Sequence, residues 1–587
     1  MIVPMKKVTV LCLAHTRDAT LEQLRDLGIL HLQPVSQRES ESVEEARREY
    51  EYVRTALEVL TPSDRPPSGR SPREVVEALW KLIHERRALD DEQAALTHQE
   101  QRYAPFGNFD PAAIQALQAH GIVVRLFQAA PKPPPNVPDD AVLVELHRDK
   151  NAIHFAVISR RPVEVPRAQE IPLPPQSLDD MRQRLSAIAE RQRAIQEEIQ
   201  SFSGDHAAVA ALLADAEDRW RFALARAGMG VGAGEAIAYL RGFCPAEEVE
   251  KLRRAAPLHG WGLVIEEPAA DDTVPTLVRL PRWVKPIEAL LELVGILPGY
   301  REVDVSAAFL IFFALFFAVL VGDAGYGALF LIGSLVASRK LPKAPRKLFA
   351  LLNIVSVATI LWGVLTGTYF GMAIQHGPLA RLRIPWLTDP ENVKRLCFLI
   401  GAVHLSLAHL WNIVRNLRSL QSIAQFGWLC TTWTMYFVAQ KMVLGLPVPH
   451  FTLPLFLTGV ICIVLFMTPV RQLKTEWFNH AMLPLNLVSN FVDVVSYIRL
   501  FAVGTASFAV ANNFNAALTP MFGQWASGLA AALFLVLAHG LNIILCLMGV
   551  MVHGVRLNTL EFSGHIGMQW TGIPFRPFRS VKQPQAE

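Results

Sequence analysis

Two arginines stand inside stretches of the sequence that are otherwise apolar and long enough for membrane helices. Arg499 lies in SYIRLFAVGTASF (Ser496–Phe508), within the apolar stretch 481–518, and Arg556 lies in VHGVRLNTLEF (Val552–Phe562). A guanidinium keeps its proton under nearly all conditions met in proteins, and placing it at bilayer depth is costly. Two such charges in consecutive apolar segments indicate a path for ions rather than a passive anchor.

Further polar side chains stand near both arginines in the sequence. Polar residues at this density inside a membrane usually face the interior of a helix bundle or a wet cavity. We therefore expect an ion-translocation site made of Arg499, Arg556, Glu561, His553, Asp493, Asn490, Asn542 and Ser496. The alternative is a structural role, in which Asp493 neutralises Arg499 as an ion pair and the histidines, including His539, are satisfied inside the bundle.

The composition argues against several other classes of protein. The net charge is only +3 over 587 residues, and no stripe of Lys and Arg is interleaved with aromatic residues, so we expect no nucleic-acid partner. The glycine cluster GMGVGA (Gly228–Ala233) follows a predicted helix instead of a strand, which argues against nucleotide binding. The six cysteines have no metal-ligand spacing, so we expect no metal site and no disulfide framework.

The elements that must position these residues fall into two unlike parts of the chain. Residues 1–300 are rich in Arg, Glu, Ala and Pro, whereas residues 301–570 are dominated by apolar runs and are predicted to form a membrane domain. At the amino terminus, charged residues directly follow a short apolar stretch, which is not the pattern of a signal peptide. We expect residues 1–300 and the tail 571–587 to be cytoplasmic.

The charged part is predicted to be two α/β lobes joined by an antiparallel coiled-coil stalk. Strand–helix–strand patterns in 1–35 and 235–270 predict one proximal lobe, and short strands in 108–175 predict a distal lobe. Apolar residues alternate at spacings of three and four in 36–103 and 176–227, which is typical of a coiled coil. The alternative is an ordinary helical hairpin that packs on its own domain.

The apolar part is predicted to be all-α, with about eight transmembrane helices. The first apolar segment is long enough for two short spans, with GDAGYG (Gly322–Gly327) as the break between them. With eight spans the loops on the cytoplasmic side hold most of the Lys and Arg residues, including Lys343, Arg471 and Lys582, whereas seven spans would place the cluster RKLPKAPRK outside. The last two apolar segments exceed the length of a perpendicular span, so we expect them to be tilted.

Several motifs together resemble subunit a, also called subunit I, of the archaeal- and bacterial-type V/A rotary ATPases. The resemblance covers nearly the whole chain, and SYIRL and HGVRL in consecutive helices form its most specific part. Beside the two arginine motifs it rests on GILPGYREVDVS (Gly295–Ser306), on GDAGYG and on TGIPFRPF (Thr571–Phe578).

The resemblance implies a non-catalytic stator subunit of an ATPase or ATP synthase, with no cofactor of its own. Its implied partners are a ring of c/K-type membrane subunits, peripheral-stalk subunits, the membrane-side subunit of the central stalk and the lipid bilayer. Arg499 matches the family's essential membrane arginine and Arg556 its companion, beside which Glu561 and His553 match family positions. The resemblance does not decide between H⁺ and Na⁺ or between ATP synthesis and hydrolysis.

The chain departs from the eukaryotic relatives at two positions of the implied ion path. Ser507 and Cys546 stand where those relatives have a histidine and a glutamate. Two other functions also remain open, a secondary transporter of an anionic solute and a structural membrane tether. The transporter would more often have repeated halves, and a tether would not explain Arg499.

Overall fold

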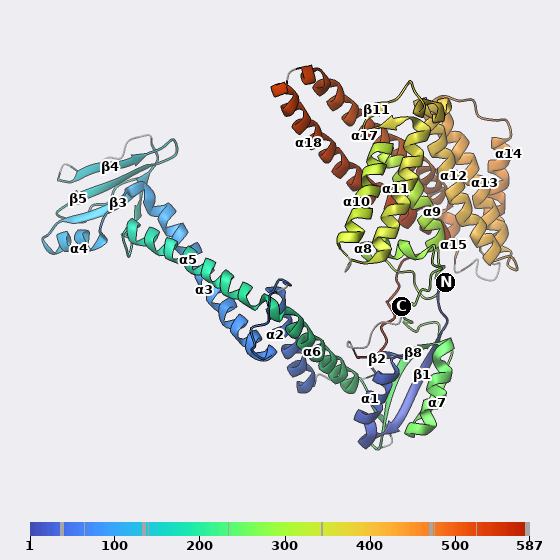
Figure 1. The fold of residues 1–587 in the computed structure, drawn as a ribbon, viewed down its shortest axis with the longest axis horizontal. Helices are drawn as coiled ribbons and strands as arrows, with labels where there is room; N and C mark the ends of the chain where they lie inside the picture. The colour runs from blue at the N-terminus through green and yellow to red at the C-terminus, as the bar shows by residue number, and fades with distance from the viewer. Residues whose placement is uncertain are drawn as a thin grey trace. The chain divides into compact units, whose positions relative to one another are not determined.

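The structure is a computed structural model. It describes residues 1–35, 40–63, 65–131, 137–138, 140–232, 234–341, 344–468, 474, 476–523 and 525–580. Lys343, Arg471, Lys582 and Ala233 therefore lie outside the described residues. The chain forms two compact units (Figure 1). The membrane unit comprises Met1–Val8, Phe243–Leu252 and Ile265–Arg576, and the arm unit comprises Thr9–Gly242, Arg253–Val264 and Pro577–Glu587.

Strands from two distant parts of the chain share one sheet, in the order β2-β8-β1-β9 with β7 beside β8. Between β1 and β2 lies α1 (Arg17–Leu27), which ends at Gly28 because that residue adopts the left-handed conformation. Between β8 and β9 lies α7 (Val249–His259). The strands are β1 (Met5–Leu13), β2 (His31–Gln33), β7 (Gly230–Gly232), β8 (Ile237–Pro245) and β9 (Gly262–Glu266).

A second, antiparallel sheet has the order β4-β5-β3-β6. The stacked rings of Phe127 and Phe155 lie 5.7 Å apart in its core. Its strands are β3 (Val123–Ala129), β4 (Val142–Arg148), β5 (Ile153–Ser159) and β6 (Ala168–Ile171), beside the helix α4 (Pro111–Ala119). The short strands predicted within 108–175 correspond to β3, β4 and β5, whereas β6 and α4 were not predicted.

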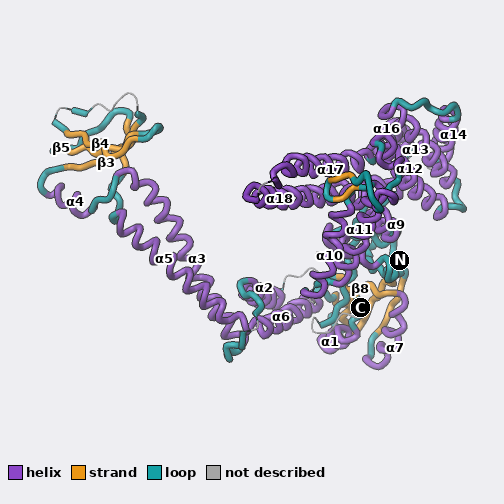
Figure 2. Tube along the Cα trace, turned by 45° about the horizontal axis from the view of Figure 1, so that its top comes forward, coloured by secondary structure: helices purple, strands orange, loops and turns teal. Residues whose placement is uncertain are grey.

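Two pairs of antiparallel helices connect these sheets within the arm unit. The helix α3 (Pro72–Tyr103) runs alongside α5 (Leu178–Ser201), and α2 (Glu41–Glu58) packs on α6 (His206–Ala227) (Figure 2). Side-chain ion pairs cross from α5 to α3, as between Arg191 and Glu85 at 2.6 Å. Serine caps begin α3 and α5, as the capping-box pattern requires. The coiled-coil stalk itself stays a prediction.

The membrane unit is built of helices that follow the apolar segments of the sequence. Its principal helices are α9 (Ser306–Val321), α10 (Ala324–Lys340), α11 (Arg346–Thr366), α12 (Pro390–Arg415), α13 (Gln421–Leu444), α14 (Thr452–Phe466), α16 (Leu483–Ser496), α17 (Ile498–Leu518) and α18 (Trp525–Gly549). Among the described residues, four helical segments are long and apolar enough to cross a membrane, namely 346–366, 390–415, 483–523 and 527–566. The helices α9 and α14 are apolar but shorter, and the count of eight spans stays a prediction.

The predicted break at GDAGYG is confirmed. Gly322 ends α9 in the left-handed conformation, and the Asp323 carboxylate then accepts the backbone N–H of Tyr326 at 3.1 Å, which caps α10. The same carboxylate accepts the backbone N–H groups of Phe370 at 2.8 Å and Gly371 at 2.7 Å. Asp323 therefore joins the α9–α10 break to the loop that follows α11.

Candidate functional site

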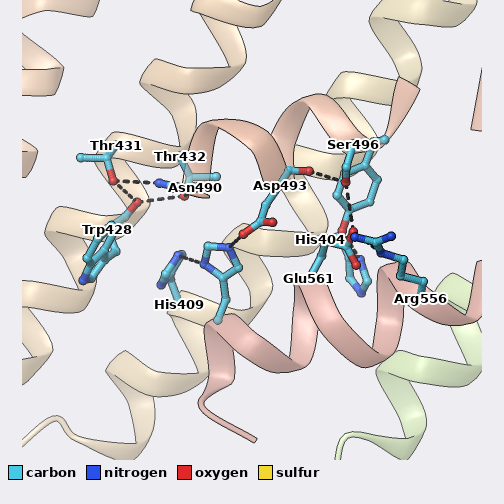
Figure 3. Close-up of polar contacts among 12 residues, drawn as sticks. His404, His409, Trp428, Thr431, Thr432, Asn490, Asp493, Ser496, Arg556 and Glu561 are labelled. Carbon is cyan, nitrogen blue, oxygen red and sulfur yellow. Dashed lines mark hydrogen bonds and ion pairs between the residues drawn. The ribbon is translucent and has the colours of Figure 1, made fainter. Parts of the chain in front are cut away.

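A buried carboxylate lies between the two arginines that the sequence singled out. Glu561 Oε1 is 2.6 Å from Arg499 Nη2. The same oxygen is 3.5 Å from Arg556 Nε (Figure 3). The Arg499 Nε–H also donates to the Ser496 carbonyl at 2.9 Å, and the Ser496 hydroxyl donates to Glu561 at 3.4 Å. Four of the eight predicted site residues thus form one cluster, which we call the arginine cluster.

The backbone near Arg556 explains how Glu561 reaches the same cluster. In an α-helix two residues five positions apart point about 140° away from each other, because each residue turns the helix by about 100°. Here Val550–Gly554 and Leu557–Phe562 are π-helical. A π-turn closes over five residues and brings residues at that spacing to one face, and such turns frequently occur at functional sites.

Asp493 does not pair with Arg499, which corrects the structural alternative considered from the sequence. Its Oδ2 is instead 3.1 Å from Nε2 of His565, in the short helix α19 (Ser563–Ile566). His565 Nδ1 lies 3.1 Å from Nε2 of His409, whose Nδ1 lies 3.0 Å from Oε1 of Gln425. These four side chains form a continuous polar chain across four helices, α16, α19, α12 and α13, which we call the histidine chain.

A cavity of about 290 Å³ joins the histidine chain to the arginine cluster. Asp493, His565 and His409 line it, and so does Glu561 of the arginine cluster. Asn490 also lines the cavity, but its buried amide is hydrogen-bonded to Thr431 and Thr432 on α13, as Figure 3 shows. The contacts of Asn490 therefore hold α16 against α13.

A second cavity, of about 420 Å³, lies beyond Arg499 along α17. Leu500, Gly504 and Thr505 of α17 line it, together with Gln375 and Arg383 of the loop after α11. It shares no lining residue with the first cavity. Arg499 therefore precedes the residues of the second cavity on α17, while its carboxylate partner lines the first.

The two remaining predicted residues lie outside the arginine cluster. Asn542 is buried and donates to the Tyr326 hydroxyl and the Ser507 carbonyl, both at 3.1 Å. Both ring nitrogens of His539 are partnered in the same region, by Tyr326 and Asn515. His553 is half-buried, and its Nδ1 has no hydrogen-bond partner among the residues described.

Ser507 and Cys546, the two positions at which the chain differs from the eukaryotic relatives, contact each other in the structure. The Ser507 hydroxyl lies 2.8 Å from the Cys546 sulfur, and both side chains are buried. The two substitutions relative to the eukaryotic pattern therefore form one neutral contact between α17 and α18. Within the described part of the chain, no group of His, Cys, Asp and Glu has the arrangement of a metal site.

Sequence reasoning missed the histidines of α12. His404 is fully buried, stacks between the rings of Phe312 and Phe562 with centroids 3.9 Å and 4.2 Å away, and contacts the Tyr497 hydroxyl at 2.8 Å. His409 and His565 belong to the histidine chain described above. A usable signal was present, because any ionisable residue inside an apolar helix is a candidate functional residue.

The apolar helices and the buried charges between them define a membrane protein with a polar centre. No family model matches the chain. The chain is 31% identical to a V-type ATP synthase subunit I from Treponema pallidum, over 99% of this chain and 100% of the relative. It is 30% identical to the subunit I of Borreliella burgdorferi, with the same coverage. The chain belongs to the V-type ATP synthase subunit I family, which confirms the resemblance found in the sequence.

More distant relatives match part of the chain. An A-type ATP synthase subunit I from Methanocaldococcus jannaschii is 23% identical over 59% of this chain and 55% of the relative. A solved cytoplasmic N-terminal domain of a V-ATPase subunit I is 21% identical and covers 44% of this chain and 99% of the solved one. Its TM-score is 0.23, so the likeness carries no conclusion about the fold.

Proposed function

We propose that this chain is the membrane stator subunit of a V/A-type rotary ATPase or ATP synthase. In this role it forms half-channels for H⁺ or Na⁺ against a rotating ring of carboxylate-bearing subunits. The observation that carries the proposal is Arg499, a permanent charge whose carboxylate partner Glu561 lines one cavity while the residues next along α17 line another. Two separate aqueous routes that meet at one fixed charge are what directional transfer requires.

Arg499 has spare hydrogen-bonding capacity for a carboxylate that arrives from outside the chain. Its Nε donates to a backbone carbonyl and its Nη2 to Glu561, while Nη1 has no protein partner among the residues described. A carboxylate in lipid travels neutral because the ionised form is too costly there. On reaching Arg499 it ionises, because the guanidinium stabilises its charged form. The proton then leaves through one half-channel, and a new one enters through the other.

The histidine chain supplies a route for protons to the arginine cluster. Histidines can both accept and donate a proton, and here two of them connect Asp493 to Gln425 in consecutive contacts of about 3 Å. The cavity beside them also reaches Glu561. We assign this cavity to one half-channel and the cavity beyond Arg499 to the other. Asn542 and His553 are assigned to the walls along α18 and its π-helical continuation.

The remainder of the chain is assigned to the stator. Residues 1–300 form its cytoplasmic domain, residues 301–570 its membrane domain and 571–587 a cytoplasmic tail. Two lobes dock the peripheral stalks, the proximal lobe of residues 1–35 with 235–270 and the distal lobe of residues 108–175. The arms 36–103 and 176–227 hold the two lobes apart. The chain binds no nucleotide and has no catalytic site of its own.

The double change R499Q/E561Q tests the proposal. If Arg499 only neutralises Glu561, removing both charges together relieves the unpaired carboxylate and restores the function lost in R499Q. If Arg499 acts on the ring carboxylate, R499Q and the double variant both lose pumping, although the double variant assembles. The measurement is ATP-driven acidification or Na⁺ uptake by vesicles that contain the purified complex. R418Q, a change at an exposed arginine after α12, is the control. Normal pumping by the double variant would refute the proposal.

A further inference from the structure

A large cavity lies where the membrane unit's helices end, away from the arginine cluster. Its volume is about 740 Å³, and it opens beside Arg415, the last residue of α12. Because α12 is one of the segments long enough to cross a membrane, its end marks the level of the membrane surface. The cavity lies between that end, the first turn of α9 and two chain segments that precede α8 (Glu288–Val294) and α9. Its lining includes Arg279, Trp283, Glu302, Asp304, Trp411 and Arg415.

The apolar side of the cavity has the character of a membrane interface. Trp283 and Trp411 are 58% and 46% exposed. Tryptophan is enriched at the level of lipid headgroups, where its ring is apolar and its N–H is polar. On the same end of α12, Leu410 and Val414 are 46% and 68% exposed, so an apolar strip of helix continues from the cavity into the bilayer.

The charged side of the cavity leaves one cation available. Asp304 accepts from the amino-terminal ammonium and from the backbone N–H of Ser306. Glu302 accepts backbone N–H groups of Gly299, Gln569 and Trp570. Both carboxylates therefore already accept hydrogen bonds from groups of the protein. Arg279, which also lines the cavity, pairs with Glu247. Arg415 has no carboxylate partner among the residues that the structure describes, so its guanidinium is free for an anion.

We propose that this cavity binds an anionic phospholipid from the surrounding leaflet. The headgroup phosphate contacts Arg415, whose planar guanidinium can donate hydrogen bonds to two phosphate oxygens at once. The ester region lies between Trp283 and Trp411, and the acyl chains follow the exposed strip of α12. Basic pockets at the ends of membrane helices bind anionic headgroups in this manner. The proposal requires that α12 lies in a membrane, and it does not depend on ion translocation through the arginine cluster.

Native mass spectrometry of the purified full chain tests the proposal with two lipids of identical acyl chains, phosphatidylglycerol and phosphatidylcholine. We expect phosphatidylglycerol to bind about fivefold more tightly, the factor that corresponds to about 1 kcal/mol for one arginine near an anionic headgroup. R415Q should remove this preference. R418Q is the matched control, because Arg418 is exposed three positions further on and does not line the cavity, and it should keep the preference. Equal binding of the two lipids by the unaltered chain would overturn the proposal.

Crosslinking of the unaltered chain locates the lipid independently of any variant. Phosphatidylglycerol with a photoreactive group in one acyl chain should label the end of α12 around Leu410–Val414. Labelling confined to other helices would contradict the proposed site. Inorganic phosphate distinguishes a lipid from a soluble anion. If phosphate alone displaces phosphatidylglycerol and labelling of α12 does not depend on the acyl chain, the ligand is a soluble anion and the lipid assignment is wrong.

Discussion

Glu561 sets the charge of the arginine cluster, because one buried carboxylate faces two guanidinium groups. The cluster keeps one excess positive charge, and Arg499 and Arg556 differ in how far they are buried. The Arg499 side chain is 23% exposed and lies 2.6 Å from Glu561, whereas Arg556 is 53% exposed and lies 3.5 Å away. Water therefore screens the charge of Arg499, the more buried arginine, less than that of Arg556.

Replacing Arg556 by lysine should be milder than replacing Arg499 by lysine. An exposed ammonium at position 556 keeps its hydration and its charge, whereas a desolvated lysine at 499 can lose its proton and cannot hold two partners in a planar fork. We expect R499K to abolish pumping and R556K to retain a measurable fraction, in vesicles that contain equal amounts of assembled complex. Equal and complete loss of pumping in both variants would contradict this ranking.

The residue types of the cluster could be predicted from the sequence, but their partners could not. A charge in an apolar segment is visible in the sequence, which is why Arg499 and Arg556 were identified. The pairing of Arg499 with Glu561 depends on π-helical turns that no periodicity of 3.6 residues reveals. The histidine chain joins α12, α13, α16 and α19, and such contacts depend on tertiary packing alone.

Glycines determine how closely the membrane helices approach each other. A Cβ built at Gly363 on α11 would lie 2.1 Å from the backbone nitrogen of Ala324, at the start of α10. Gly427 of α13 and Gly459 of α14 face each other in the same manner, each with its Cβ position within 3.0 Å of the other's carbonyl oxygen. Small residues at such crossings allow close backbone packing in membranes.

Replacing Gly363 by alanine should destabilise the membrane unit by roughly 1–3 kcal/mol, the usual range for overpacking. The backbone at Ala324 cannot move freely, because Asp323 beside it holds both the cap of α10 and the loop after α11. Thermal unfolding of the purified chain in detergent provides the measurement. The control is G333A on α10, where a Cβ meets nothing within 4 Å. A melting temperature of G363A equal to that of G333A would show that the close approach is not rigid.

At the scale of elements, the helices and breaks that have strong sequence patterns could be predicted, and the elements with weak patterns could not. Long apolar runs located the membrane helices, and the glycines of GDAGYG located the break after α9. The helix α4 was missed although Asp110 and Pro111 form an ordinary helix start. The strand β6 was missed because it has only four residues, three of them at least partly exposed. Such a strand is defined by its pairing with β3 and not by its own pattern.

At the scale of the whole molecule, the distribution of charge along the chain predicts how it crosses the membrane. Basic residues concentrate at the carboxyl ends of α10 and α12, which end in Arg339–Lys340 and in Arg415. With the amino-terminal half in the cytoplasm, these ends also lie there only if α9 and α10 cross the membrane separately. A single crossing by the segment 306–337 would instead place both basic ends outside.

Cysteine labelling distinguishes these topologies, because they place the same loops on opposite sides. Three exposed positions serve as probes, His376 after α11, Ser419 after α12 and His450 after α13. The six native cysteines, which are all free, are first replaced. With eight spans, H376C and H450C should react with a membrane-impermeant maleimide in intact cells, and S419C only after permeabilisation. Seven spans predict the reverse at all three positions. Labelling of S419C in intact cells would therefore refute eight spans and place the basic end of α12 outside.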